Sequence, residues 1–161
     1  MKLANQLALA SVVAALCTAA MAQELPKSGT INVHIGLKIS AEAMDMAEKR
    51  VQGHGSSLGV SFNDRGAGPL HEGPVACFWS FFVSDKGSKT KGYCTYGDPD
   101  NDRMFLDFSG GDPGSGPRGV LELVGGTGKY TSIQGDGQWK CRNVGPNGQE
   151  VCTVQFNYRL P

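Results

Sequence analysis

Two stretches of the sequence carry residues whose types and spacing could hold a charged ligand. The first, "GGTGKY", runs from Gly125 to Tyr130 and looks like a loop that cradles phosphate. A phosphate loop needs a glycine, four further residues, and then Gly-Lys followed by Ser or Thr. Leu123 stands in place of that first glycine, Tyr130 follows the lysine, and no helical pattern comes after it. We interpret the segment as a turn between two strands, in which glycine supplies positive φ angles.

The second stretch, "GDPDNDR", places Asp98, Asp100 and Asp102 at alternate positions, as at the start of a calcium-binding loop. An EF-hand loop counted from Asp98 requires glycine at its sixth position and glutamate at its twelfth. Arg103 and Ser109 occupy these positions. An Asp-rich turn is therefore the main interpretation, and weak calcium binding by the three aspartates is the alternative. We predict no other metal site and no cofactor.

Polar side chains between apolar neighbours are candidates for acid–base chemistry, because desolvation raises the pKa of a carboxyl group. Glu122 lies between two leucines, and Asn63 and Asp107 also lie in apolar segments. The catalytic candidates are Glu122, Asn63 and Asp107. If Glu122 faces the interior, its pKa is raised and it could act as an acid or base, whereas if it faces outward it is merely solvated. The sequence alone does not decide between these two orientations.

Aromatic side chains form the other group of candidates. Inside a small barrel such residues either fill the lumen or line a ligand cavity. A packed core and an apolar pocket are thus both consistent with the sequence. The pocket candidates are Phe62, Trp79, Phe81, Phe108, Trp139 and Tyr158.

Four cysteines follow residue 22, at positions 77, 94, 141 and 152. Turn signals, "DKG" and "GPNG", lie at the midpoints of the first two and of the last two. Each pair would then sit across a hairpin, where opposed Cα atoms are about 4.5–5.5 Å apart, within disulfide range. We predict the disulfides Cys77–Cys94 and Cys141–Cys152. Free buried cysteines or a metal site are the alternatives, although the spacings match no common zinc pattern.

The first 22 residues have the features of a secretory signal peptide. Lys2 is the only charged residue before Glu24, and a nearly continuous apolar run ends in the small-x-small sequence "AMA" before Gln23. The run is short for a membrane span. We predict that residues 1–22 are removed and that residues 23–161 form one domain, periplasmic or secreted, with no membrane span.

The overall charge excludes some partners. The chain has 15 basic and 15 acidic residues and shows no basic stripe. Nucleic acid and anionic membrane are therefore not predicted as partners.

Short strands must position these residues. "TINVHIGLKIS" alternates strictly between apolar and polar residues, and "PVACFWSFFVS" is apolar on both faces. Together with later runs separated by Gly, Pro, Asp and Asn, they predict about eight or nine strands in a sandwich or barrel. One segment disagrees: residues 40–52, "SAEAMDMAEKRVQ", are rich in helix formers, and Ser40 is placed as an N-cap. Local propensity therefore predicts a helix there.

These segments resemble a known group of proteins. "LVGGTGKYTSIQGDG" resembles the glycine-rich hairpin of the allene oxide cyclase and dirigent proteins. "GVSFNDRGAGPLH", "KGYCTYGDPDNDRMFLDFSG" and "GQWKC" resemble small exported bacterial proteins of the same barrel superfamily, and the similarity covers residues 28–160. The resemblance implies an all-β, calycin-like fold, a single closed antiparallel barrel of about eight strands around a cavity. It also implies a strand at residues 43–52.

The plant members of this group act on hydrophobic substrates, by cyclising an epoxide of an unsaturated fatty acid or by guiding the coupling of phenolic radicals. No catalytic residue of either kind aligns here, so no active site is transferred. The leading hypothesis is an exported barrel that binds a small hydrophobic molecule in its lumen. The alternatives are an isomerase or cyclase of hydrophobic substrates, and a structural or interaction protein of the cell envelope with a filled barrel. The plant relatives form oligomers, so a homo-oligomer is a further expectation.

Overall fold

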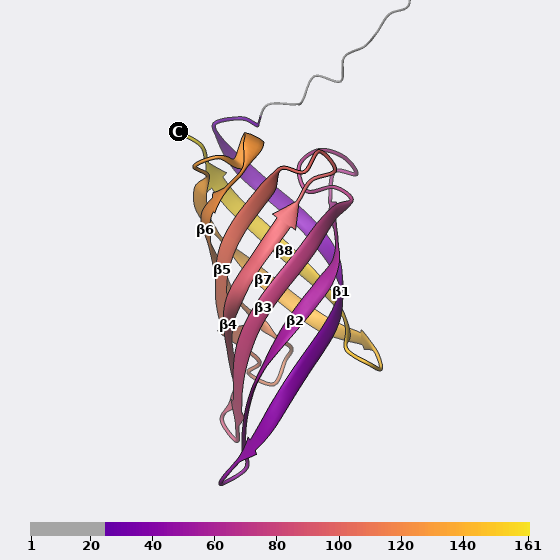
Figure 1. Cartoon of the computed structure of the whole chain (residues 1–161), viewed down its shortest axis with the longest axis vertical. Coiled ribbons are helices and arrows are strands. Elements are labelled where there is room, and N and C mark those ends of the chain that lie inside the picture. Colours follow the sequence, from indigo (N-terminus) through magenta and orange to yellow (C-terminus); the bar gives the residue numbers. More distant parts are fainter. Residues whose placement is uncertain (1–24) are drawn as a thin grey trace, which may run out of the picture.

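Each strand of the chain pairs with the next, and the last pairs with the first. The computed structural model describes residues 25–161, and the predicted signal peptide, residues 1–22, lies outside them. Within residues 25–161, eight strands form a closed barrel in sequential order, and every pair is antiparallel (Figure 1). The prediction of an all-β, closed antiparallel barrel is confirmed.

The elements in chain order are β1 (Ser28–Met46), β2 (Arg50–Asn63), β3 (Gly73–Ser84), β4 (Gly87–Gly97), β5 (Arg103–Gly111), β6 (Arg118–Gly126), the 3₁₀ turn η1 (Gly128–Tyr130), β7 (Gln134–Gly145) and β8 (Gln149–Arg159). No helix in the described residues has the length and apolar character needed to cross a membrane.

The connections alternate between two ends of the barrel. The β1–β2, β3–β4, β5–β6 and β7–β8 turns lie at one end, which we call the open end. The β2–β3, β4–β5 and β6–β7 loops lie at the other, the capped end, near the C-terminus in Figure 1. The glycine-rich segment and the Asp-rich turn belong to two of these capped-end loops, so the closed barrel brings them together.

Alternation along the strands builds the core. In β1 the side chains of Ile31, Val33 and Ile35 are buried, whereas Asn32 and His34 between them are exposed. Successive side chains of a strand point to opposite faces, so one face of each strand fills the barrel and the other meets water. The strictly alternating segment therefore lies as its pattern predicts.

The segment predicted by propensity to be helical, residues 40–52, is a β-hairpin instead. β1 continues to Met46, β2 begins at Arg50, and the two strands remain in register from Ser40 opposite Ser56 to Met46 opposite Arg50. The two strands are already paired further along the barrel, so each extra residue adds ladder hydrogen bonds to an existing template. Pairing overrides a weak local preference in this situation. The family resemblance implies one strand at residues 43–52, and the structure instead has the end of β1, a turn at residues 47–49 and the start of β2.

Two disulfides cross adjacent strands. Cys77 on β3 is bonded to Cys94 on β4, and Cys141 on β7 to Cys152 on β8, each opposite its partner in the register. This is the pairing that the turn positions predict.

Candidate functional site

The capped end of the barrel is filled with side chains. Tyr130, Phe156, Met104 and Leu70 are fully buried there. Tyr96 packs edge-on against Phe156, with ring centroids 5.2 Å apart. These buried side chains form the part of the core that fills the barrel at its capped end.

Lys129, from the glycine-rich segment, lies among the three aspartates of the β4–β5 turn. Its ammonium nitrogen is 2.6 Å from a carboxylate oxygen of Asp98, 2.6 Å from one of Asp100 and 3.8 Å from one of Asp102. The Tyr130 hydroxyl donates a 2.7 Å hydrogen bond to Asp98, and the Lys129 backbone N–H donates one of 3.0 Å to Asp102. The lysine therefore takes the place that a bound cation would have among these carboxylates, and it ties the two loops together.

The pKa shifts in this cluster follow from the same contacts. The hydrogen bond from Lys129 holds the pKa of Asp100 below its usual value. Partial burial disfavours the Lys129 ammonium, but its bonds to Asp100 and Asp98 outweigh burial and raise its pKa. Burial and the bond to Asp98 raise the pKa of Tyr130 well above the usual range, so its hydroxyl remains a neutral donor. The cluster therefore joins the β4–β5 and β6–β7 loops by ion pairs. Its lysine pairs with carboxylates and not with a phosphate.

Gly125 and Gly128 are required where they stand. Their φ angles, +140° and +54°, lie in the region that other residues rarely adopt. A Cβ atom on Gly128 would also overlap the Asp102 carboxylate. The glycines thus supply the positive φ angles that the turn interpretation predicts and let the backbone approach an aspartate.

The lumen is hollow toward the open end. A cavity of about 250 Å³ lies there, and its walls are mainly apolar and aromatic. Its lining includes Tyr96, Leu106, Leu37 and Val83. Both disulfides face it as well. Ligand sites in proteins are typically apolar cavities with few polar groups, so this is the candidate functional site.

Two pairs of aromatic rings dominate the wall. Trp79 lies against Phe81 with ring centroids 5.5 Å apart, and Phe108 meets Trp139 edge-to-face at 5.7 Å. The indole N–H of Trp79 donates a 3.0 Å hydrogen bond to the hydroxyl of Ser57. The indole of Trp79 is therefore held in one orientation, with its polar atom satisfied and its ring facing the cavity.

Glycines on β2 make room for two of these rings. Gly55 lies opposite Trp79, and Gly53 opposite Phe81. A methyl group on Gly55 would come within 2.7 Å of the Trp79 ring, and one on Gly53 within 2.5 Å of the Phe81 ring. Because such distances are too short for real contacts, each ring needs a glycine beside it.

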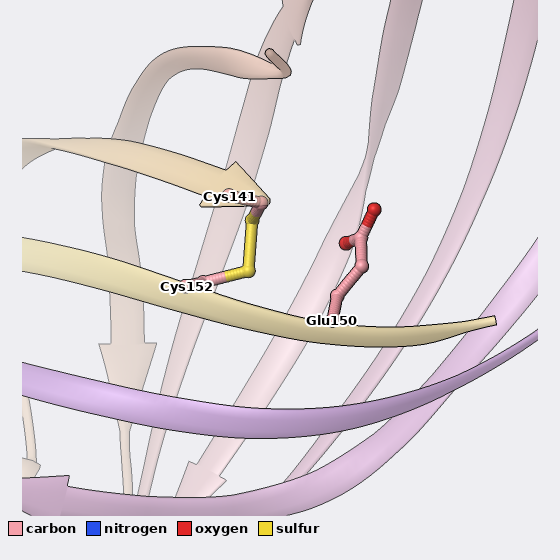
Figure 2. A group of neighbouring side chains, drawn as sticks. All are labelled: Cys141, Glu150 and Cys152. Carbon is pink, nitrogen blue, oxygen red and sulfur yellow. A yellow bond between two sulfur atoms is a disulfide. The ribbon is translucent and has the colours of Figure 1, made fainter. Parts of the chain in front are cut away.

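Glu150 is the only carboxylate among the described residues that line the cavity. It precedes Cys152 by two positions on β8, so both side chains point to the same side of the strand (Figure 2). A carboxylate oxygen of Glu150 and the sulfur atoms of Cys141 and Cys152 all lie within 4.8 Å of one another. Those sulfurs are joined in a disulfide, whereas a metal ligand must be a thiolate.

The Glu150 side chain is partly exposed and borders the apolar cavity. Within residues 25–161, none of the ion pairs involves its carboxylate. Desolvation raises its pKa. A charge that is partly desolvated among apolar side chains gains from a partner, so a ligand cation that pairs with Glu150 would gain affinity.

The structure separates the predicted pocket residues into two groups. The cavity is lined by Trp79, Phe81, Phe108 and Trp139. Phe62 lies on the outer wall and is 46% exposed, because its neighbours Ser61 and Asn63 take the inward positions. Tyr158 is buried at the capped end, away from the cavity.

The predicted catalytic residues lie elsewhere. Asn63 is buried at the end of β2, where its amide donates a 2.8 Å hydrogen bond to the carbonyl of Pro69 in the β2–β3 connection. Asp107 and Glu122 face each other across β5 and β6 on the outer wall, in a depression open to solvent. None of the three lines the lumen cavity.

The sequence contains a signal for the inward orientation of Glu150, which is not among the predicted site residues. In "EVCTVQF" the glutamate stands two residues before Cys152. If the disulfide turns Cys152 toward the inside of the barrel, the period of two turns Glu150 inward as well.

No protein-family model matches the chain, and no curated protein matches it. Among solved structures, the barrel is similar to the crystal structure of a protein of unknown function from the DUF3224 family of Shewanella oneidensis MR-1. The TM-score is 0.58 at 15% sequence identity, and the match covers 83% of this chain and 98% of that chain. At this identity the likeness shows the fold alone.

Proposed function

We propose that the chain is an exported barrel protein that binds a small hydrophobic molecule in its lumen. The observation that carries the proposal is the 250 Å³ cavity lined by aromatic rings. An engineered apolar cavity of about 150 Å³ accommodates benzene, so the cavity here suits a ligand of roughly ten non-hydrogen atoms.

Export is part of the same proposal. Residues 1–22 would be removed, and residues 23–161 would act as one domain in the periplasm or outside the cell. The two disulfides support this location, since such bonds persist in oxidising compartments.

A second function, an isomerase or cyclase of hydrophobic substrates, is favoured by one observation. Glu150 is a carboxyl group of raised pKa beside an apolar cavity, and such a group can give or take a proton. This is the activity that the resemblance to allene oxide cyclase and dirigent barrels implies. Turnover of an epoxide that is lost in Glu150→Gln and kept in Glu122→Gln would support it.

The binding proposal is tested by two measurements. Native mass spectrometry of the purified, oxidised protein should show a bound lipophile that is released on denaturation. Titration with neutral hydrocarbons, followed by tryptophan fluorescence, should show saturable binding, because both tryptophans of the chain line the cavity.

A matched pair of variants locates the binding. Leu37→Phe adds atoms inside the cavity and should weaken binding by about tenfold, the equivalent of about 1.4 kcal/mol. Leu58→Phe makes the same change on the outer wall, where Leu58 is exposed, and should leave the affinity unchanged. Equal affinities for both variants would place the ligand outside the lumen.

A further inference from the structure

The lumen cavity is lined by an acidic side chain and by no basic one in the part of the chain that the structure describes. Glu150 is acidic, and the cavity-lining residues of the described chain include no lysine, arginine or histidine. An anionic ligand would therefore meet a carboxylate with no cation to balance either charge. A neutral ligand would form no ion pair with the Glu150 carboxylate, whereas a cationic ligand would.

The aromatic walls have the same preference. The face of an aromatic ring carries partial negative charge and attracts cations, most strongly when the ring is an indole. Trp79, Trp139, Phe81 and Phe108 all line the space that Glu150 borders. The face of each of these rings favours a positive charge over a negative one.

From this pattern we propose that the lumen selects a small apolar amine in its ammonium form over neutral or anionic molecules of the same size. The ammonium group would pair with the Glu150 carboxylate, and the apolar body would occupy the aromatic part of the cavity. This inference rests on the proposed function and adds the chemical class of the ligand. It also runs against a fatty-acid ligand, whose carboxylate would face Glu150.

The test uses three molecules of nearly equal shape that differ in charge: cyclohexylmethylamine, cyclohexylmethanol and cyclohexanecarboxylate. Binding to the full oxidised protein at neutral pH is followed by tryptophan fluorescence, since none of the three absorbs in that range. We expect the amine to bind at least about tenfold more tightly than the alcohol, because only the ammonium group forms a charge-assisted hydrogen bond with the Glu150 carboxylate, and we expect the carboxylate ligand to bind most weakly.

Two variants assign the selectivity to one residue. Glu150→Gln keeps the shape of the side chain and should remove most of the preference for the amine, since only the weaker attraction of the aromatic rings remains, while leaving the affinity for the alcohol unchanged. Glu122→Gln removes an exposed carboxylate of the outer wall and should leave the preference for the amine intact. Circular dichroism checks the fold of both, and the three-ligand series with the unmodified protein tests the selectivity without any variant.

The outcomes separate the two proposals. Binding of the alcohol without a preference for the amine overturns the amine inference and leaves the lumen-binding function standing. A preference that persists undiminished in Glu150→Gln overturns the assignment to that residue. Failure of all three molecules, together with failure of the neutral hydrocarbons, overturns both.

Discussion

Replacing Lys129 by methionine removes the ammonium group from among three carboxylates and keeps most of the side chain's length. Asp98, at 2.6 Å, is only 2% exposed, so its charge would be left nearly buried without its cationic partner. Breaking a buried ion pair in this way costs about 3–5 kcal/mol. Asp98 keeps the hydrogen bond from Tyr130, and Lys129 itself is partly exposed, so we expect the lower end, about 3 kcal/mol.

The measurement is the free energy of unfolding from denaturant titration, with the thermal midpoint as a second reading. For a chain of this size, about 3 kcal/mol corresponds to a fall in Tm of roughly 10 °C. The matched control is Arg50→Met, because Arg50 forms a 2.8 Å ion pair with Glu48 in which both side chains are exposed. Exposed pairs contribute about 0–1 kcal/mol, so the control should lose little.

The difference between the Lys129 variant and the unmodified protein should depend on pH. The hydrogen bond from Lys129 lowers the pKa of Asp100. A carboxyl group whose pKa is lowered by folding stabilises the protein above its unfolded pKa, about 3.9, and loses that contribution as the pH falls through its folded pKa. The difference in the free energy of unfolding between the unmodified protein and Lys129→Met should therefore become smaller below about pH 4.

Calcium provides a further check on the same cluster. With Lys129 present, added Ca²⁺ should leave the Tm unchanged, because the ammonium group already lies among the carboxylates. In Lys129→Met, Ca²⁺ should raise the Tm. The reasoning is refuted if Lys129→Met loses no more stability than Arg50→Met, or if the unmodified protein is itself stabilised by Ca²⁺.

Replacing both Cys141 and Cys152 by alanine should lower the free energy of unfolding by about 3 kcal/mol, because the bond closes a loop with a sequence separation of 11; denaturant titration measures this. Asp107, Glu122 and Asp136 lie side by side across β5, β6 and β7, with Glu122 in the middle. Because like charges in this position repel, Glu122→Gln should stabilise the protein by up to about 1 kcal/mol at low salt and by less at high salt. Gly55→Val should push the Trp79 ring from its position, shift the tryptophan emission and cost about 1–3 kcal/mol of stability. No change in emission would show that the ring does not depend on this glycine.

The barrel could be predicted from the sequence because its signals are local. Strict alternation fixes which face of β1 is buried, and turn residues midway between cysteines place Cys77 opposite Cys94 and Cys141 opposite Cys152. The β1–β2 hairpin could not be predicted in this way. Its residues favour a helix in isolation, and only pairing with strands that already exist makes them extended.

The contacts of the Lys129 cluster and the position of the lumen cavity could not be predicted, for a different reason. Lys129 meets Asp98 and Asp100 across a sequence distance of about thirty residues, and nothing in either motif indicates the other. Strand alternation gives the face of Glu150, but only the closed barrel shows that this face borders a cavity and not packed side chains.

The sulfur atoms of both disulfides lie on the cavity side of the wall, and the four cysteines are at most 8% exposed. A reducing thiolate must reach a sulfur atom to attack it, since exchange proceeds through a mixed disulfide. A molecule that fills the lumen therefore stands in the path of the reductant. The rate at which a small thiol reduces these disulfides therefore reports the fraction of protein that holds a ligand. The disulfides of the ligand-bound protein should persist longer in a reducing environment than those of the empty protein.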